Sequence, residues 1–169
     1  MGNVQLVRLT DDRDHGFLRL IAQDDPVNTD HLGLCTNDRS DPPVITEPAK
    51  GLTLGYLRTG VLCGVVSFTA GDLKGKKRST GEISSLYVWS KGHRYIIGER
   101  MLMTLLRIIS EEFPKITEVK LSVVSYNEPA KRLYSRFGFR HQVTLEKAIR
   151  IAGEYRDKDL MMLELDKKY

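Results

Sequence analysis

Three polar side chains between residues 82 and 134 could take part in proton transfer and ligand binding. Tyr134 carries a phenol that can give a proton to a departing group, and Glu82 carries a carboxylate that can accept one. Asn127 has a side-chain amide that can cap a helix and bind a ligand at the same time. These residue types suit a reaction that needs both an acid and a base.

The stretch from Leu121 to Phe139 must position two of these side chains. A β-rich run over residues 118–124 comes first, and Asn127 then stands where a helix cap belongs, with Pro129 inside the first turn. Four residues recur at helical spacing: Ala130, Leu133, Tyr134 and Phe137. Gly138 follows as the usual left-handed stop of a helix. The sequence therefore predicts a strand, a short helix and a further strand here.

The remaining elements are predicted from alternation and helical periodicity. Strands are expected over residues 4–9, 53–57, 61–69, 82–89, 118–124, 140–145 and 160–165. A long helix is expected over 96–112, ending before Pro114, and a helical pattern follows Asp11-Asp12. Long polar loops are expected over 25–50 and 146–158. Counting in twos along the strand places Glu82 on the same face as Ser84, Leu86 and Val88.

The string around Tyr134 resembles motif B of the GNAT N-acetyltransferase superfamily. In that motif an Asn, an Ala three residues on, a Leu-Tyr pair and a Gly-Phe pair surround bound coenzyme A. This chain has Asn127, Ala130, Leu133-Tyr134 and Gly138-Phe139 with no gap. The resemblance implies one GNAT domain over residues 1–169, of the α/β (α+β) class. Its sheet is expected to be mixed, mostly antiparallel and twisted, with six to seven strands flanked by about four helices.

Motif A of the same family is a strand, a loop and the start of a long helix, whose backbone N–H groups bind the pyrophosphate of coenzyme A. Its pattern, Arg/Gln-x-x-Gly-x-Gly/Ala, falls on residues 93–98, where Gly98 keeps the expected type but His93 and Ile96 do not. A β-branched residue such as Ile96 disfavours positive φ. The N–H donors, however, belong to the backbone, so the pyrophosphate-binding arrangement is still expected if φ stays negative. The acetyl-CoA-binding residues that the resemblance implies are Leu86, Tyr87, Val88, His93, Arg94, Tyr95, Ile96, Ile97, Gly98, Glu99, Asn127 and Ala130.

The implied reaction is direct transfer of an acetyl group from the thioester of acetyl-CoA to a primary amine. Tyr134 stands at the family's position for the general acid that protonates the leaving thiolate. Glu82 matches a strand glutamate that acts as general base in the histone acetyltransferase branch. The acceptor is an amine-bearing small molecule or protein, and pairing of two copies through the C-terminal strands would give a homodimer. The sequence does not identify the acceptor.

Simpler interpretations stand beside these roles. Tyr134 could be a core aromatic residue, Asn127 only a cap, and Glu82 a solvated residue near the start of a strand. His93 could be a surface histidine, and Gly98 could serve only the close packing of helices. The alternative function is a catalytically degenerate GNAT-like module that binds or regulates, and the changes in motif A favour it.

Composition narrows the class of protein. The 169 residues are 41% hydrophobic and 28% charged, as in an ordinary globular domain, and no uncharged apolar run reaches the roughly 18 residues of a membrane span. The net charge of +4 is spread along the chain, so nucleic acid ranks last among the partners considered. The absence of a signal-like start and the two distant cysteines, Cys35 and Cys63, predict a cytoplasmic protein without a metal site.

Overall fold

The computed structural model describes residues 3–9, 50–71, 79–88, 92–151 and 153–165. The elements in these residues are β1 (Val4–Arg8), β2 (Gly51–Arg58), β3 (Val61–Ala70), β4 (Ser79–Val88), α2 (Arg94–Glu112), β5 (Ile116–Val124), α3 (Glu128–Arg136), β6 (Arg140–Ile151) and β7 (Glu154–Glu164). The predicted early helix and nearly all of the predicted loop over 25–50 lie outside the described residues.

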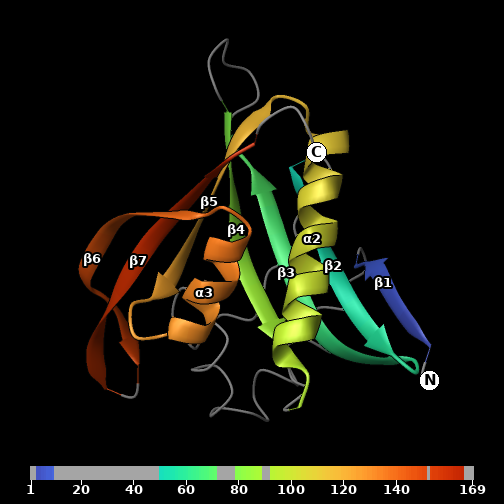
Figure 1. The fold of residues 1–169 in the computed structure, drawn as a ribbon, viewed down its shortest axis with the longest axis horizontal. Coiled ribbons are helices and arrows are strands. Elements are labelled where there is room, and N and C mark those ends of the chain that lie inside the picture. The colour runs from blue at the N-terminus through green and yellow to red at the C-terminus, as the bar shows by residue number, and fades with distance from the viewer. Residues whose placement is uncertain (1–2, 10–49, 72–78, 89–91, 152, 166–169) are drawn as a thin grey trace.

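All seven strands form one sheet, in the order β1-β2-β3-β4-β5-β7-β6. Every neighbouring pair is antiparallel except β4 and β5, which are parallel and are joined through α2. Both α2 and α3 lie on one face of the sheet (Figure 1). The mixed, mostly antiparallel sheet is thus confirmed, and the described residues hold two helices where about four were expected in the whole chain.

The sheet opens between its two parallel strands. Pairing of β4 with β5 begins at Ser79↔Ile116 and ends at Ile83↔Leu121, although β4 continues to Val88 and β5 to Val124. Beyond that point β4 is paired only with β3, and β5 only with β7. Figure 1 shows the two strands diverging toward the end of the sheet where α2 and α3 begin. We call this opening the β4–β5 split.

An irregularity in β4 coincides with the start of the split. Ser67 of β3 pairs with Ser85, but the next residue, Phe68, pairs with Ile83, so Ser84 is an extra residue on β4. A bulge of this kind bends a strand and reverses which side chains face the core. The prediction that Glu82 shares a face with Leu86 and Val88 was therefore wrong. Ile83 shares that core face with them, and Glu82 lies on the opposite face.

The main core fills the space between the sheet and the two helices. Long α2 contributes five fully buried apolar side chains to it, and each is at most 2% exposed: Ile97, Met101, Leu102, Leu105 and Ile109. Short α3 contributes Ala130, Leu133 and Tyr134 to the same cluster. A smaller apolar cluster on the other face of the sheet contains Leu9, Val65 and Tyr87. The two helices are thus fixed against the sheet on either side of the split.

The segment that the sequence predicted as a polar loop over 146–158 forms a long β-hairpin instead. β6 runs to Ile151, β7 starts at Glu154, and Gly153 adopts a φ of 83° in the turn between them. Nearly every residue of β6 is exposed, so the strand lacks the hydrophobic alternation from which a half-buried strand is recognised. The helix α2 also begins two residues earlier than expected, at Arg94.

Candidate functional site: the end of the sheet between the two helices

The start of α2 presents backbone donors beside the split. His93 precedes the helix without capping it through its side chain, and the first helical hydrogen bond runs from the Ile97 N–H to the His93 carbonyl at 3.0 Å. The N–H groups of residues 94–96 therefore come before the first acceptor that the helix supplies. The first turn contains no acidic side chain, so the positive end of the helix dipole is not neutralised locally.

The isoleucine in place of the motif A glycine leaves this geometry intact. Ile96 is helical, and the only non-glycine residues of the described chain with positive φ are Thr59 and Lys147. The Ile96 side chain is 49% exposed and lines a pocket on the β1–β2 side of α2, away from α3. The expected negative φ is thus present, and the side chain does not project between the two helices.

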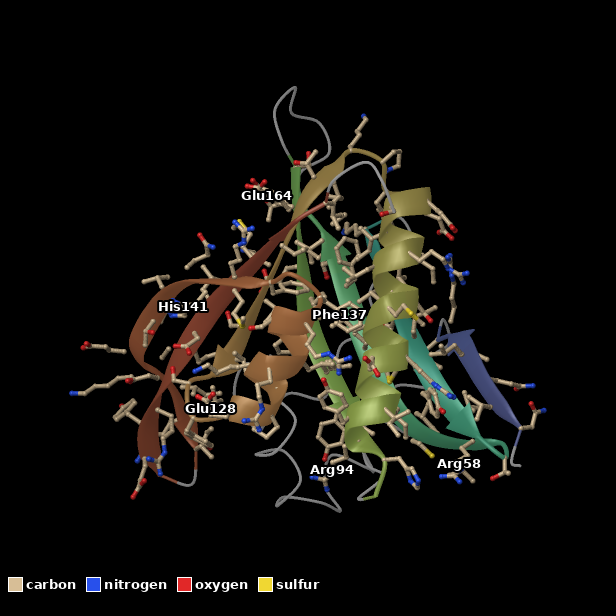
Figure 2. The ribbon with its side chains drawn as sticks, in the orientation of Figure 1. Arg58, Arg94, Glu128, Phe137, His141 and Glu164 are labelled. Carbon is tan, nitrogen blue, oxygen red and sulfur yellow. The ribbon has the colours of Figure 1, made fainter. Side chains whose placement is uncertain are left out.

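Arg94 supplies a direct test of whether this end of α2 fits an anionic group. Its Nε atom is buried and has no hydrogen-bond partner in the described part of the chain. A buried charged donor without an acceptor is costly, and a phosphate oxygen at the start of the helix would satisfy it. Figure 2 shows Arg94 at the end of the molecule where Glu128 starts α3. The residues here therefore fit a phosphate-bearing ligand.

A pocket of about 540 Å³ lies between α2 and α3. It is lined by Tyr95, Glu128, Lys131, Arg132, Ser135 and Arg136. Arg136 crosses the boundary between the helices, because its guanidinium donates to the Tyr95 hydroxyl and lies 3.2 Å from a Glu99 carboxylate oxygen. Three cationic side chains against one acidic one make the pocket suitable for an anion.

Gly98 of α2 lies against Leu133 of α3. A Cβ atom at this position would lie 3.3 Å from the Leu133 Cδ2 atom of α3, which is closer than ordinary van der Waals contact. Glycine at this position therefore lets α2 and α3 pack together, and this in turn places the start of α2 beside the first turn of α3.

Asn127 and Ala130 form the cap of α3. The Asn127 Oδ1 atom accepts a hydrogen bond from the Ala130 N–H at 3.2 Å, and both residues are at most 4% exposed. The predicted cap is thus confirmed. Pro129 occupies the first turn, as expected from the sequence.

Tyr134 lies in the second turn of α3, on the side that faces the sheet. It is 1% exposed, and its ring centroid lies 5.9 Å from that of Phe139 at a tilt of 59°. The residue is therefore part of the core on the helix-bearing face, beside the arm of the split formed by β5.

Glu82 is not brought together with the other predicted residues. It precedes the split by one residue, and its carboxylate lies 3.3 Å from Lys120 Nζ, with about half of the side chain exposed. Of the β4 residues that follow, Leu86 and Val88 belong to the main core, whereas Tyr87 belongs to the smaller cluster on the other face. Glu82 and Tyr134 consequently lie on opposite faces of the sheet.

A polar cluster around the buried Asp159, which the sequence patterns did not indicate, fixes the turn between β5 and α3. The Asp159 carboxylate accepts hydrogen bonds from Ser125 Oγ and Thr144 Oγ1, both at 2.7 Å, and lies 3.0 Å from Lys131 Nζ. Lys131 Nζ also donates to the Ser125 carbonyl oxygen at 3.0 Å. We call these four residues the Asp159 cluster. It escaped notice because Asp159 directly follows the segment that was predicted to be a polar loop.

The ionisation of this cluster follows from its contacts. Burial by itself raises the pKa of Asp159, but the hydrogen bonds from Ser125, Thr144 and Lys131 and the charge of Lys131 lower it from 3.8 to about 2. Hydrogen bonds to Glu128 and Asp159 raise the pKa of Lys131. The cluster therefore stays ionised at neutral pH and ties α3, β6 and β7 to the turn that follows β5 at the split.

Two further properties hold within the described residues. No group of three or more His, Cys, Asp or Glu side chains there could hold a metal ion. No helix in that part of the chain is long and apolar enough to cross a membrane.

Solved structures share this architecture. Arabidopsis thaliana NAA60 in complex with acetyl-CoA superposes with a TM-score of 0.74 at 15% identity, covering 96% of this chain and 99% of that one. A GNAT-family acetyltransferase from Streptococcus pneumoniae gives 0.75 at 18% identity, covering 97% and 100%. An N-acetyltransferase from Staphylococcus aureus Mu50 gives 0.67 at 17%, covering 96% and 97%. At these identities the likeness establishes the fold.

Sequence comparison establishes the family. A search of curated proteins gives no match. The family model described as the acetyltransferase (GNAT) family, however, matches residues 12–139, which is more than half of the chain and includes β2 through α3. Together with the split sheet and the helices beside it, this match shows that the protein belongs to the GNAT acetyltransferase family.

Proposed function

We propose that this protein is an acetyl-CoA-dependent N-acetyltransferase that moves an acetyl group from the thioester to a primary amine by direct attack. Proteins of the GNAT family use acetyl-CoA as the acetyl donor. The observation that carries the proposal is the β4–β5 split, which opens directly beside the exposed N–H groups at the start of α2.

Three parts of this end of the molecule suit three parts of the donor. The N–H groups of residues 94–96 and Arg94 suit the pyrophosphate, since donors and a positive helix end converge there. The cationic pocket between α2 and α3 suits the phosphorylated nucleotide end. The split suits the narrow, uncharged arm that carries the thioester. Leu86 and Val88 are apolar core residues along one side of it.

The proposed reaction forms a C–N bond and breaks the C–S bond of the thioester. A lysine-like amine with a pKa near 10.4 is neutral in only about one molecule in 10³ at pH 7, so removal of its proton contributes to the barrier. The departing sulfur needs a proton in return. We assign the acid role to Tyr134, whose phenol lies on the helix-bearing face, and the base role to Glu82, acting through water from the other face.

The opposite placement of these two groups supports a two-sided arrangement. The donor enters from the face that carries α2 and α3, where Tyr134 lies, and the amine enters from the face where Glu82 lies. A split between the strands lets the two substrates meet at the acetyl carbon. Backbone N–H groups along the unpaired edge of β4 near Tyr87 could stabilise the oxyanion that develops during attack.

A second candidate function is a GNAT-like module that binds acetyl-CoA or a partner without catalysis. Two observations favour it: Tyr134 is only 1% exposed, and the Glu82 carboxylate is held by Lys120. Either arrangement would have to change before the side chain could exchange a proton with a substrate. The two candidates therefore differ in turnover.

A thiol-release assay with acetyl-CoA and a panel of amines tests the proposal. The panel contains peptides with free N-termini, peptides with an internal lysine, polyamines, aminoglycosides, amino acids and arylamines. We expect at least one amine to raise thiol release well above the rate with acetyl-CoA alone, with mass spectrometry showing one added acetyl group on that amine. Binding of acetyl-CoA without turnover of any amine would select the non-catalytic module, and absence of acetyl-CoA binding would refute the transferase.

A further inference from the structure

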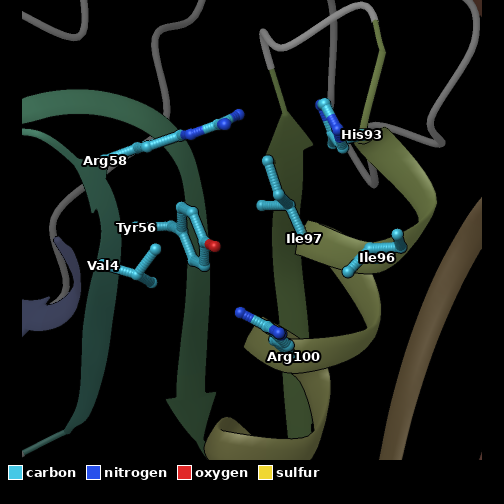
Figure 3. Close-up of a pocket in the computed structure, with 7 residues that line it drawn as sticks. All are labelled: Val4, Tyr56, Arg58, His93, Ile96, Ile97 and Arg100. Carbon is cyan, nitrogen blue, oxygen red and sulfur yellow. The ribbon is translucent and has the colours of Figure 1, made fainter. Parts of the chain in front are cut away.

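A second pocket lies on the opposite side of α2 from α3. It has a volume of about 430 Å³ and opens between the start of α2 and the ends of β1 and β2. Its lining consists of Val4, Tyr56, Arg58, His93, Ile96, Ile97 and Arg100. Figure 3 shows Tyr56 and Arg58 projecting from the strands, and Ile97 and Arg100 projecting from the helix, toward the space between them. We call this space the Arg58–Arg100 pocket.

The charge of this pocket is one-sided. Among the described residues that line it are two arginines and a histidine, and none of these lining residues is acidic. Within the described residues, neither Arg58 nor Arg100 takes part in an ion pair, although most other charged side chains of α2 and α3 at this end do, such as Glu99 with Arg136. Two guanidinium groups that face one space without a counter-charge attract an anion and can bind it with two parallel hydrogen bonds each.

Tyr56 gives an independent indication that a polar ligand group belongs there. The residue is 3% exposed, yet it lines the pocket, and no hydrogen bond of its hydroxyl is found among the described residues. In Figure 3 the hydroxyl points across the pocket toward α2. A phenol that is almost entirely buried usually has a hydrogen-bond partner, and a ligand oxygen in the pocket would provide it.

The rest of the lining is apolar. Val4, Ile96 and Ile97 supply aliphatic surface, and the Tyr56 ring forms part of the strand-side wall. Val4 and Ile96 are 39% and 49% exposed, which is high for large apolar side chains. A ligand with an apolar body would cover this surface while its anionic group lies between the arginines.

This pocket lies on the other side of α2 from the proposed nucleotide pocket, although three of its lining residues, His93, Ile96 and Ile97, are among those that the family resemblance assigns to acetyl-CoA. The proposed nucleotide pocket is lined by Tyr95 and residues of α3, and the two pockets share no lining residue. Helix α2 separates them. Ile96, the residue that departs from the family's glycine, has its side chain on the Arg58–Arg100 side.

We propose that the Arg58–Arg100 pocket binds a small organic anion, in which an apolar body carries one carboxylate or phosphate group. The anionic group is held between Arg58 and Arg100 and accepts a hydrogen bond from the Tyr56 hydroxyl. The apolar body lies against Val4 and Ile96. This inference rests on the pocket alone and holds whether or not the protein transfers acetyl groups.

Calorimetric titration of the full chain with benzoate and with phenyl phosphate tests the inference and identifies the preferred anionic group. We expect at least one probe to bind at millimolar concentration or below. Arg58→Ala and Arg100→Ala should each weaken binding by about tenfold or more, since each removes a charged hydrogen-bonding partner. Tyr56→Phe should weaken binding by a smaller factor, and Arg58→Lys should retain part of it.

Two matched arginine variants serve as controls. Arg107→Ala removes an exposed arginine of α2 outside the pocket and should leave binding unchanged. Arg132→Ala alters the other pocket and should also leave it unchanged. Circular dichroism and the thermal midpoint establish that each variant is folded. Absence of binding by both probes, equal weakening by Arg107→Ala, or weakening by Arg132→Ala without an effect of Arg58→Ala and Arg100→Ala would each overturn the proposal.

Discussion

The two residues of the proposed acid–base pair, Tyr134 and Glu82, have very different surroundings. Tyr134 is enclosed by the core, whereas Glu82 is half-exposed and lies 3.3 Å from Lys120. A core position fixes the direction of a phenol and excludes water from it, both of which suit a proton donor. An exposed carboxylate suits a base that acts through water. These surroundings lead to separate predictions for the two residues.

Replacement of Tyr134 by phenylalanine removes the hydroxyl and keeps the ring in the core. We expect turnover to fall by about a hundredfold or more, the usual range for a general acid, while the affinity for acetyl-CoA changes little. Steady-state kinetics and calorimetry measure the two effects separately. Tyr155→Phe, at an exposed position of β7, is the control and should leave turnover unchanged. Equal turnover in Tyr134→Phe and the parent would remove Tyr134 from the acid role.

Replacement of Glu82 by glutamine keeps the size of the side chain and removes its charge. We expect activity to fall most at low pH, because the amine is then hardest to deprotonate and depends most on a base. The measurement is kcat/KM from pH 6 to pH 9. Glu118→Gln, on the neighbouring strand, is the matched control and should keep the parent profile. A pH profile of Glu82→Gln parallel to that of the parent would eliminate Glu82 as the base.

At the scale of elements, the Asp159 cluster joins α3, β6 and β7 to the turn that follows β5. The stability that the cluster contributes to the fold depends on pH in a defined direction. The pKa of Asp159 is lowered in the folded protein to about 2 from 3.8, so its contribution is present above about pH 5 and is lost as pH falls toward 2. That difference corresponds to about 2 kcal/mol in the free energy of unfolding.

Urea denaturation of Asp159→Asn against the parent at pH 7 and pH 3 measures this contribution. We expect the variant to be less stable at pH 7 by about 2 kcal/mol or more, since Lys131 also loses its buried partner. The difference in the free energy of unfolding between variant and parent should be smaller at pH 3. Glu154→Gln, at an exposed residue of the same strand, controls for removal of a charge. The same difference at both pH values would show that Asp159 does not stabilise through its charge.

The packing of α3 against α2 at Leu133 depends on a small residue, Gly98. Gly98→Val places branched atoms against Leu133 Cδ2, where even a Cβ atom would lie at 3.3 Å. We expect a loss of about 1–3 kcal/mol of stability, as for an overpacked core. Thermal or urea denaturation measures it. Met103→Val, at an exposed position of α2, shows the cost of a β-branched residue in the same helix. Equal losses in both variants would contradict a packing role for Gly98.

Elements with strong local signals could be predicted from the sequence. Asn127, Pro129 and Gly138 define the ends of α3, and its cap is found as expected, because these preferences arise within a few residues. The hairpin of β6 and β7 was missed, because most of β6 is exposed and the strand lacks the hydrophobic alternation of a half-buried strand. The bulge at Ser84 was missed because only the pairing with β3 reveals it.

The elements of the candidate site lie together as expected, but the relative placement of its residues differs from the prediction. The start of α2 and the first turn of α3 do lie together at the split. The separation of Glu82 from Tyr134 by the sheet depends on the bulge, and the Asp159 cluster joins residues from three elements and a turn. Such relations arise from tertiary pairing, which no local pattern encodes. The proposed roles of these residues in binding and catalysis stay predictions.

The molecule as a whole is a sheet divided into two halves that are joined by a short parallel ladder. β1 to β4 form one half, β5, β7 and β6 form the other, and the two helices lie over the junction. β6 is the outer strand of its half, with Val143 and Leu145 each 44% exposed. A homodimer formed through this edge stays a prediction. The proposed reaction takes place at this junction, since the acetyl donor and the amine acceptor must meet there.

Calorimetric titration of the full chain with acetyl-CoA tests the central claim most directly. We expect saturable binding with one acetyl-CoA per chain, weakened about tenfold or more by Arg94→Ala, because Arg94 presents a buried nitrogen without a partner at the start of α2. The exposed Arg107→Ala control should bind like the parent. Absence of heat with millimolar acetyl-CoA, together with an unchanged thermal midpoint, would contradict the claim that this end of the sheet binds the acetyl donor.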